Sequence, residues 1–399
     1  MILISAAAMI GCAEGGVKRE SVPAIDTTNF DKSIALNEDF YEHATRGWQQ
    51  KHPLKPEFSR YGSFDMLRET NEKQINELFQ SMTSMKAEAG SVEQKISDLY
   101  KLGMDSVRLN EEALAPVKED LAKIYAITDL QTMIPVLGEL HNSVSNPLFG
   151  LGVDADLMNS TQNILYAQQS GLGMGNRAYY LDEENASQRE GYVAFLTKAV
   201  ELAEVEGAAE KAAAVLDFET KMAKDFRSMV ELRDISANYN PTTREAFVSR
   251  YDAIDWESYF AAVGIGECEQ MVVGQPEVLD AVNKLLKSTP IEVVKDYLAA
   301  GYLRSAASYL NDELNAASFD FFGRQMSGAQ QQRPRWKRAM GVPNSILGEA
   351  VGKMYGAKYF PEEDKVRMTE LVKNLQVALG QNIEALEWMS DETKARAQE

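Results

Sequence analysis

Apolar side chains recur at helical spacing along most of this chain, and no other feature of the sequence constrains its fold as strongly. Two sets with this spacing are Leu67, Ile75, Leu78, Phe79 and Met82, and Val92, Ile96, Leu99 and Tyr100. Residues three or four apart lie on one face of a helix, so both sets predict amphipathic helices that face a core. Further helices are predicted over residues 187–206, 208–232, 242–262, 276–288, 290–316 and 363–389, with shorter ones over 111–145.

One stretch departs from this pattern. Residues 148–168 alternate in the manner of strands, with a turn at Asp156 to Ser160. A period of two is typical of β-strands. The fold class that follows is mainly α, with many helices and a small β element near residues 148–168.

The stretch from Phe319 to Pro361 is the most distinctive part of the chain. It opens with an apolar anchor formed by Phe319, Phe321, Phe322 and Met326. Pro334 has no backbone donor, so it is best placed where a helix begins. Beyond Pro343, the small residues Gly348 and Gly352 predict a second helix that approaches another backbone closely.

Four basic residues cluster at Arg333, Arg335, Lys337 and Arg338. The chain as a whole is acidic, with 60 Asp and Glu against 41 Lys and Arg and a formal net charge of −19. Binding to a polyanion needs a positive field over a whole face, so this balance argues against nucleic acid as a partner. We therefore expect a cationic helix face that pairs with acidic neighbours. Glu349 is expected to be one such neighbour, or otherwise a buried acid.

The first twelve residues, MILISAAAMIGC, form an apolar segment that predicts export. Their last four are similar to a lipobox, so Cys12 is the predicted lipidation site. The usual basic n-region is absent, which indicates a truncated or misassigned start, and a shortened ordinary signal peptide is the alternative. Cys12 and Cys268 are too few for a disulfide framework. Cys268 lies between glutamates, which disfavour its thiolate, so we expect a small buried or loop thiol and not a nucleophile.

Six segments carry a resemblance to a known family. In chain order they are DFYEHATRGW (39–48), SRYGSFDMLRE (59–69), RAYYLDEEN (177–185), ELRDISANYNPTT (231–243), PRWKRAMGVPNSILGEAVGKMYGAKYFPEEDKVRM (334–368) and ALEWMSDETKARA (385–397). From about Asn29 onward the chain resembles the neprilysin-like zinc metallopeptidases, the family of neprilysin, endothelin-converting enzyme and bacterial oligopeptidase O. Six matches in the family's order are more specific than any single motif. The low cysteine content indicates the bacterial members.

The residues that such an enzyme needs for catalysis are not found in this sequence. A zinc peptidase of this type uses H-E-x-x-H, which places two imidazoles one helical turn apart with a glutamate as the base. The chain has only His43, His52 and His141, and no two are four apart. We therefore expect no catalytic residues and no metal site in this chain. Zn²⁺ is implied for the complete enzyme.

The resemblance does carry over a substrate contact. In the family, an arginine and nearby residues of the R-Y-x-x-F-D-x-L-R segment line the cleft, where the arginine engages the C-terminal carboxylate of the peptide. The matching positions are Arg60, Asp65 and Arg68. A guanidinium binds a carboxylate through two parallel charge-assisted hydrogen bonds, and Asp65 is expected to hold the guanidinium in place. Without the family, the arginines would be interpreted as surface ion pairs.

The resemblance also implies a domain organisation. Residues 1–12 would be the export signal and 13–28 a tether. Residues 29–55 would be an N-terminal tail that packs on the catalytic domain, and 56–390 the helical lid around the substrate cavity. Residues 391–399 would begin a truncated catalytic domain, because the chain ends inside a helical pattern without a stop signal.

The function implied for the complete enzyme is hydrolysis of small peptides on the amino side of hydrophobic residues. The expected partners are small peptides and a C-terminal zinc domain, in the same polypeptide or a separate chain, with membrane contact only through a lipid anchor. The expected location is the bacterial periplasm or outer membrane, as a lipoprotein. Two alternatives stay open: a non-catalytic cell-envelope domain that binds peptides or partners, and one half of a split enzyme.

Overall fold

The computed structural model describes residues 25–143 and 145–399 of the chain, so the predicted signal, Cys12 and most of the tether lie outside the described residues. The chain divides into two compact units, Met1–Lys55 and Pro56–Glu399. In the first unit, helix α1 (Phe40–Lys51) begins after Asp39, whose side chain accepts a hydrogen bond from the backbone N–H of Glu42 at 2.9 Å. Such a cap satisfies a backbone donor that the first helical turn leaves free.

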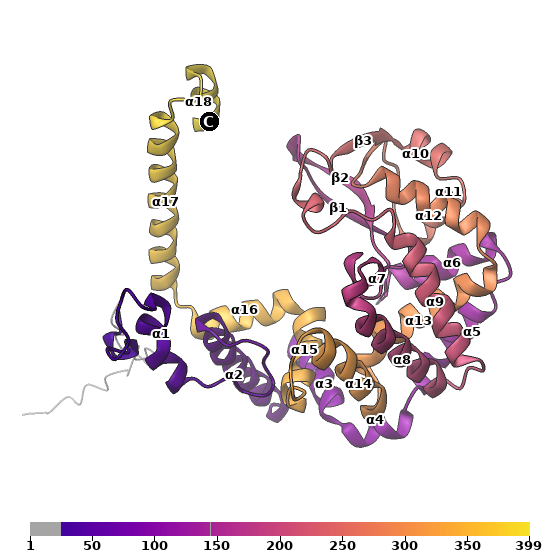
Figure 1. Cartoon of the computed structure of the whole chain (residues 1–399), viewed down its shortest axis with the longest axis horizontal. Helices are drawn as coiled ribbons and strands as arrows, with labels where there is room; N and C mark the ends of the chain where they lie inside the picture. Colours follow the sequence, from indigo (N-terminus) through magenta and orange to yellow (C-terminus); the bar gives the residue numbers. More distant parts are fainter. Residues whose placement is uncertain (1–24, 144) are drawn as a thin grey trace, which may run out of the picture. The chain divides into compact units, whose positions relative to one another are not determined.

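The second unit is mainly helical, which confirms the predicted fold class (Figure 1). Its helices are α2 (Ser63–Ser84), α3 (Val92–Met104), α4 (Ser106–Glu112), α5 (Lys118–Tyr125), α6 (Leu130–His141), α7 (Ala178–Leu181), α8 (Ala186–Leu202), α9 (Ala208–Ala223), α10 (Arg244–Arg250), α11 (Trp256–Val263), α12 (Pro276–Ser288), α13 (Ile291–Ala306), α14 (Asp312–Ser318), α15 (Arg335–Ile346), α16 (Gly348–Tyr359), α17 (Glu362–Ala385) and α18 (Asp391–Gln398). A π-helical segment, Phe319–Met326, follows α14 directly and carries the predicted apolar anchor. Phe321 of this segment is buried against Tyr192 and Phe195.

Several predicted helices are shorter than the apolar pattern indicated. The segment 242–262 contains two helices, because Asp255 accepts a hydrogen bond from the N–H of Ser258 and starts α11 anew. The segment 290–316 is divided in the same way by Asn311, which caps α14. Caps of this kind decide where a helix begins, and apolar spacing alone does not reveal them.

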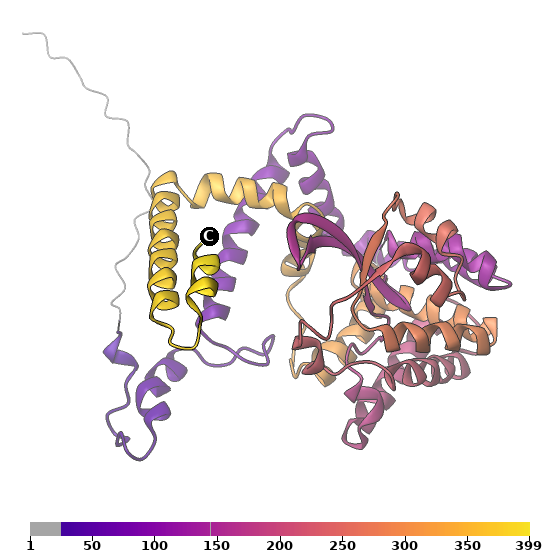
Figure 2. The ribbon, with the colours of Figure 1, turned by 90° about the horizontal axis from the view of Figure 1, so that it is seen from above.

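The predicted β element is confirmed as the hairpin of β1 (Phe149–Asp156) and β2 (Asn159–Gln169). Two short strands that we did not predict complete the sheet, β3 (Asn240–Thr243) and β4 (Gln270–Val273). The strand order is β1-β2-β4-β3, with β2 and β4 parallel and the other pairs antiparallel. Figure 2 shows the long curved hairpin, whose tip is exposed.

Two hydrophobic cores fill the second unit. The larger core unites the sheet with helices from α5 to α14, and its fully buried side chains include Phe149, Tyr192, Phe218, Phe247 and Tyr259. The smaller core is formed by α2, α3, α15 and α16, and contains Ile75, Leu78, Phe79, Met82, Ile96, Tyr100, Ala339, Met340 and Val351. Most members of the two apolar sets first recognised in the sequence therefore face the smaller core, but Leu67 and Val92 do not, since they are 65% and 39% exposed.

The close backbone approach predicted at Gly348 and Gly352 is wrong for the described residues, since a Cβ atom at either position would meet nothing within 4 Å. The close approach in the smaller core lies elsewhere. A Cβ atom at Gly103 of α3 would lie 2.9 Å from the Cα atom of Ala339 in α15. The absence of a side chain at Gly103 therefore lets these two helices touch.

Helix α17 is 24 residues long, yet none of its residues is buried. Its exposed apolar side chains are Val366, Met368, Leu371, Val372, Leu375, Val377 and Leu379. Among the described residues, no helix combines the length and apolarity that crossing a bilayer requires.

Candidate substrate-binding site

The predicted substrate contacts lie at the start of α2. Arg60 is in the extended segment that precedes the helix, and its side chain is exposed. Within residues 25–143 and 145–399, its guanidinium makes no hydrogen bond or ion pair with the protein. Because all its donors are free, Arg60 is available to an anionic ligand.

Asp65 and Arg68 are engaged with each other. Asp65 Oδ1 accepts a hydrogen bond from Arg68 Nη2 at 2.8 Å, and its Oδ2 accepts one from the backbone N–H of Gly62 at 2.9 Å. The Arg68 guanidinium also lies over the ring of Phe58, 5.3 Å from its centroid. Asp65 therefore caps α2 and orients Arg68, and no hydrogen bond or ion pair joins it to Arg60 among the described residues.

The segment that carries Arg60 is held in place from its other end. The carbonyl oxygen of Pro56 accepts hydrogen bonds from the backbone N–H groups of Gln330 and Gln331, at 2.8 and 2.9 Å. The next residue, Glu57, accepts a hydrogen bond from Lys337 Nζ at 2.5 Å. These contacts fix the segment against the turn before α15 and against α15 itself, so Arg60 extends from an anchored backbone.

Lys337 is the centre of a buried ionic cluster. Only 7% of its side chain is exposed, and its Nζ lies 2.5 Å from Glu57, 3.8 Å from Glu69 and 3.6 Å from Glu72. Arg333 forms a further ion pair with Glu72. Three carboxylates thus surround two cations, with two of the carboxylates contributed by α2 and the Lys337 ammonium by α15. A buried charge is tolerated only when it is paired in this way.

The prediction of a cationic face that pairs with acidic neighbours is confirmed by this cluster and by the ion pair of Arg335 with Asp312. Glu349 is not one of these neighbours. It is exposed, so both of its predicted roles, buried acid and partner of the basic run, are wrong. The reason is its place in the first turn of α16, where the side chain points to solvent.

The amino-acid sequence matches the model of one known protein family. A model described as peptidase family M13 matches residues 36–399, which is most of the chain. This chain belongs to peptidase family M13. The predicted resemblance to the neprilysin-like metallopeptidases is thereby confirmed.

Individual M13 proteins show how far the likeness extends. The chain is 27% identical over 398 residues to human endothelin-converting enzyme 1, covering 95% of this chain and 51% of that protein. It is 25% identical to the neutral endopeptidase of Lactobacillus helveticus, covering 93% of this chain and 58% of that protein. The crystal structure of the Mycobacterium tuberculosis zinc metalloprotease Zmp1 with an inhibitor matches with a TM-score of 0.87 at 30% identity, over 94% of this chain and 57% of that one. The chain therefore spans about half the length of the curated relatives it matches.

The histidines of this M13 chain have other partners. His43 Nδ1 and His52 Nδ1 each contact a backbone carbonyl oxygen, at 2.6 and 3.0 Å. Both ring nitrogens of His141 are engaged, one with the Tyr259 hydroxyl and one with the carbonyl oxygen of Pro147, and burial lowers the pKa of His141. Within the part of the chain that the structure describes, no three His, Cys, Asp or Glu residues are grouped to hold a metal ion. These residues do not fit a zinc site.

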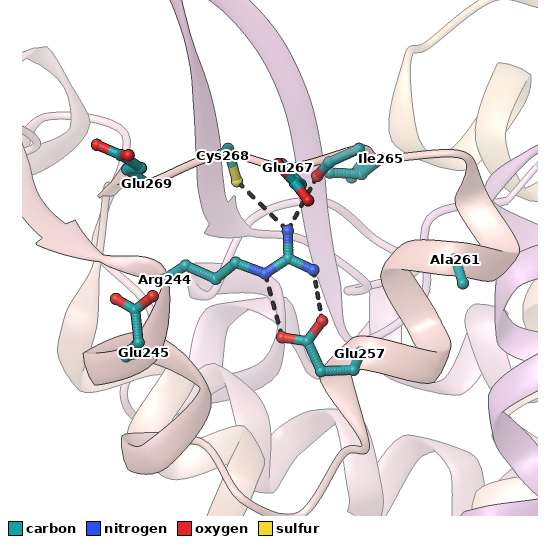
Figure 3. A pocket seen from close by; sticks show the side chains of 9 residues that line it. Arg244, Glu245, Glu257, Ala261, Ile265, Glu267, Cys268 and Glu269 are labelled. Carbon is teal, nitrogen blue, oxygen red and sulfur yellow. Dashed lines mark hydrogen bonds and ion pairs between the residues drawn. The ribbon is translucent and has the colours of Figure 1, made fainter.

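Cys268 lies in a loop at the edge of a pocket of about 550 Å³, which is also lined by Arg244 and several glutamates (Figure 3). Arg244 Nε and Nη2 donate to both carboxylate oxygens of Glu257, at 3.1 and 2.6 Å, and Nη1 lies 4.0 Å from Cys268 Sγ. The hydrogen bond to Glu257 raises the pKa of Arg244, so its charge is already compensated. None of the described lining residues is a histidine that would activate the thiol. The described lining of the pocket therefore offers no histidine base to Cys268.

The anchoring role of Lys337 was missed in the sequence, although a signal was present. Glu69 and Glu72 are three residues apart, so they lie on one face of the predicted helix and need a cation there. The only indication of which residue supplies this cation was the basic run at 333–338, which is distant in the chain. Only the folded structure shows that the basic run pairs with these glutamates.

Proposed function

We propose that this chain is the N-terminal portion of a zinc metalloendopeptidase that hydrolyses small peptides on the amino side of hydrophobic residues. The family match over residues 36–399 carries the proposal, supported by the likeness to an inhibitor-bound zinc metalloprotease. In this proposal, the helices of Pro56–Glu399 form a lid that encloses the substrate cavity. Enclosure would admit short peptides and exclude folded proteins.

Arg60 is the proposed contact to the C-terminal carboxylate of the substrate. Its guanidinium is exposed and unpaired in the described residues, whereas the segment behind it is anchored through Pro56 and Glu57. A free guanidinium on a fixed backbone binds a carboxylate with little loss of conformational entropy. Asp65 and Arg68 are proposed to shape the same subsite, since their mutual ion pair fixes the start of α2 beside it.

The zinc ion of the complete enzyme is proposed to be held by a C-terminal domain, either in the same polypeptide or in a separate chain. When bound, zinc activates water for peptide hydrolysis. The exposed apolar side chains of α17 support a place for that domain to pack, because monomeric soluble proteins rarely leave a large apolar surface uncovered. In this arrangement, the present chain contributes the cavity and the substrate contact.

The experiment that tests the substrate contact compares Arg60→Met with the unchanged complete enzyme on two forms of one short peptide. One form has a free C-terminal carboxylate and the other a C-terminal amide. Loss of a charge-assisted hydrogen-bonded contact of about 1.5–3 kcal/mol should reduce kcat/KM for the free acid by about 10- to 100-fold. The amide should be affected much less, because it lacks the charge that Arg60 binds.

The matched control is Arg250→Met, which removes a similar charge from an exposed ion pair with Asp280. It should leave the ratio of acid to amide cleavage unchanged. If Arg60→Met lowers cleavage of both peptides equally, or of neither, the carboxylate contact is wrong. If the complete enzyme shows no chelator-sensitive cleavage at all, the peptidase proposal itself fails.

We also propose that the protein is exported to the bacterial cell envelope and anchored by lipid at Cys12, which lies outside the described residues. The support is the apolar N-terminal segment that ends in a lipobox-like run. Incorporation of labelled fatty acid in the native host should disappear in Cys12→Ser. Labelling that persists in this variant would refute the anchor.

A further inference from the structure

A cavity of about 450 Å³ lies where the two hydrophobic cores meet, and we call it the junction cavity. Its walls come from α3, α4 and α15 on one side and from the end of α13 and the turn after it on the other. The apolar lining residues are Leu99, Leu102, Leu109, Pro116, Val117, Ala306, Leu310, Ala339 and Val342. A volume of this size, with mainly apolar walls, is typical of a small-molecule site.

The charged residues of the junction cavity are not equivalent. Arg108 is neutralised by Glu112, since its Nε lies 2.7 Å from the carboxylate, and Arg335 is neutralised by Asp312. Arg338 has no carboxylate partner among the described residues. Its Nε donates to the backbone carbonyl of Arg333 at 3.2 Å, and its Nη1 donates to Asn315 Oδ1 at 2.9 Å. Neutral oxygens thus orient this guanidinium, and no carboxylate among the described residues pairs with it directly.

The environment of Arg338 favours the arrival of an anion. Burial and the neighbouring Arg335 lower the pKa of Arg338, and the attraction of Asp312 offsets only part of this effect, so the charged guanidinium is destabilised in this place. A ligand carboxylate would remove that penalty by pairing with it. The single uncompensated cation also sets the ligand charge, because a polyphosphate would bring several negative charges to one arginine.

We propose that the junction cavity binds a small molecule with an aliphatic body and one carboxylate, whose oxygens accept hydrogen bonds from Arg338. The body would be buried against the apolar walls, where removal of apolar surface from water supplies the binding free energy. The ligand would contact α3 and α15 from the smaller core and α13 from the larger one. This site is independent of Arg60 and of the proposed peptidase activity.

The test uses isothermal titration calorimetry of the protein with decanoate, kept below its micelle concentration, and with decanol as the uncharged analogue. Decanoate should bind at a single site, and at least about tenfold more tightly than decanol, as expected for a charge-assisted hydrogen-bonded contact. Arg338→Met should remove this preference. Arg250→Met, the matched control on an exposed ion pair, should keep it.

A second variant tests the cavity itself. Leu102→Trp places a larger side chain in the wall, and Leu102 is 44% exposed, so the fold should tolerate the change. Circular dichroism checks that each variant is folded. Loss of decanoate binding in Leu102→Trp supports the proposal. The proposal is overturned if the unchanged protein does not bind decanoate, if decanol binds equally well, or if Arg338→Met and Arg250→Met have equal effects.

Discussion

The larger and the smaller core of this M13 chain are closed in different ways. The larger core is sealed by aromatic packing, in which Phe149, Trp256 and Tyr259 contact one another with ring centroids 4.9 to 5.6 Å apart. The smaller core is closed on one side by ions, with Lys337 held among the carboxylates of Glu57 and its neighbours. Apolar packing is non-directional, whereas hydrogen-bonded ion pairs fix particular atoms in particular places.

The two kinds of closure also differ in what lies beside them. The segment that joins this ionic cluster through Glu57 also carries Arg60, the proposed carboxylate contact, so directional contacts hold the backbone near that side chain. The larger core contains a buried carboxylate as well, but there Glu219 accepts hydrogen bonds from the hydroxyls of Tyr180 and Tyr192 at 2.5 and 3.1 Å. The Glu219 carboxylate is therefore bonded to groups within the larger core. We expect its protonation to affect the stability of the fold.

The largest effect is expected from Lys337→Met, which removes the cation at the centre of the cluster. Glu57, Glu69 and Glu72 would stay buried with much of their compensation lost, and an uncompensated buried charge costs about 3–5 kcal/mol. Urea unfolding should show a loss of this size in the free energy of unfolding. Lys287→Met, which breaks an exposed pair with Asp252, should cost at most about 1 kcal/mol. Equal losses in the two variants would show that the buried cluster contributes no more to the free energy of unfolding than an exposed ion pair.

A pH-dependent effect is expected at Glu219. Burial raises the pKa of Glu219 from 4.5 to about 7, so between these values the folded protein binds a proton that the unfolded chain releases. The corresponding stability is present below pH 4.5 and is lost as the pH rises to about 7, a change of about 3 kcal/mol. Glu219→Gln cannot ionise and should not show this loss.

The measurement is urea unfolding of both proteins from pH 4.5 to 8. The stability of Glu219→Gln relative to the unchanged protein should rise with pH across this range. Glu257→Gln serves as the control, because hydrogen bonding to Arg244 lowers the pKa of that exposed carboxyl below 4.5, so its difference from the unchanged protein should stay nearly constant over this range. A constant difference between Glu219→Gln and the unchanged protein would contradict the assignment.

The smallest effect is expected from a pair of glycine substitutions in helices that pack around the smaller core. Gly103→Ala would place a methyl group 2.9 Å from Ala339 Cα and should force α3 and α15 apart, at a cost of about 1–3 kcal/mol. Gly352→Ala meets nothing within 4 Å and should stabilise α16 by up to about 1 kcal/mol through helix propensity. Thermal unfolding should show a lower melting temperature for Gly103→Ala and a higher one for Gly352→Ala. If both variants are stabilised, α3 and α15 are not in close contact at Gly103.

The sequence predicted the secondary structure best where a regular apolar pattern extends over many residues. The prediction for 276–288 coincides with α12, and the hairpin at 148–168 alternates over enough residues to be recognised. Strands β3 and β4 have only four residues each, and their pairing partners are distant in the chain, so no local pattern marks them.

The candidate site was predictable only in part. Family resemblance identified Arg60, Asp65 and Arg68, but it did not reveal that Asp65 pairs with Arg68 and leaves Arg60 free. Likewise, the basic run was evident, while its pairing with Glu57 and Glu72 depends on contacts between segments more than 250 positions apart. The roles of Arg60, Asp65 and Arg68 in substrate binding stay predictions.

The most direct measurement is the intact mass of the protein isolated from its native source, together with peptidase activity before and after chelation. We expect a mass well above the 44.4 kDa encoded by these 399 residues, and activity that a chelator abolishes and zinc restores. A mass near 44.4 kDa, without activity even after zinc is added, would contradict this account. It would indicate a helical domain that acts alone or with a separate partner chain.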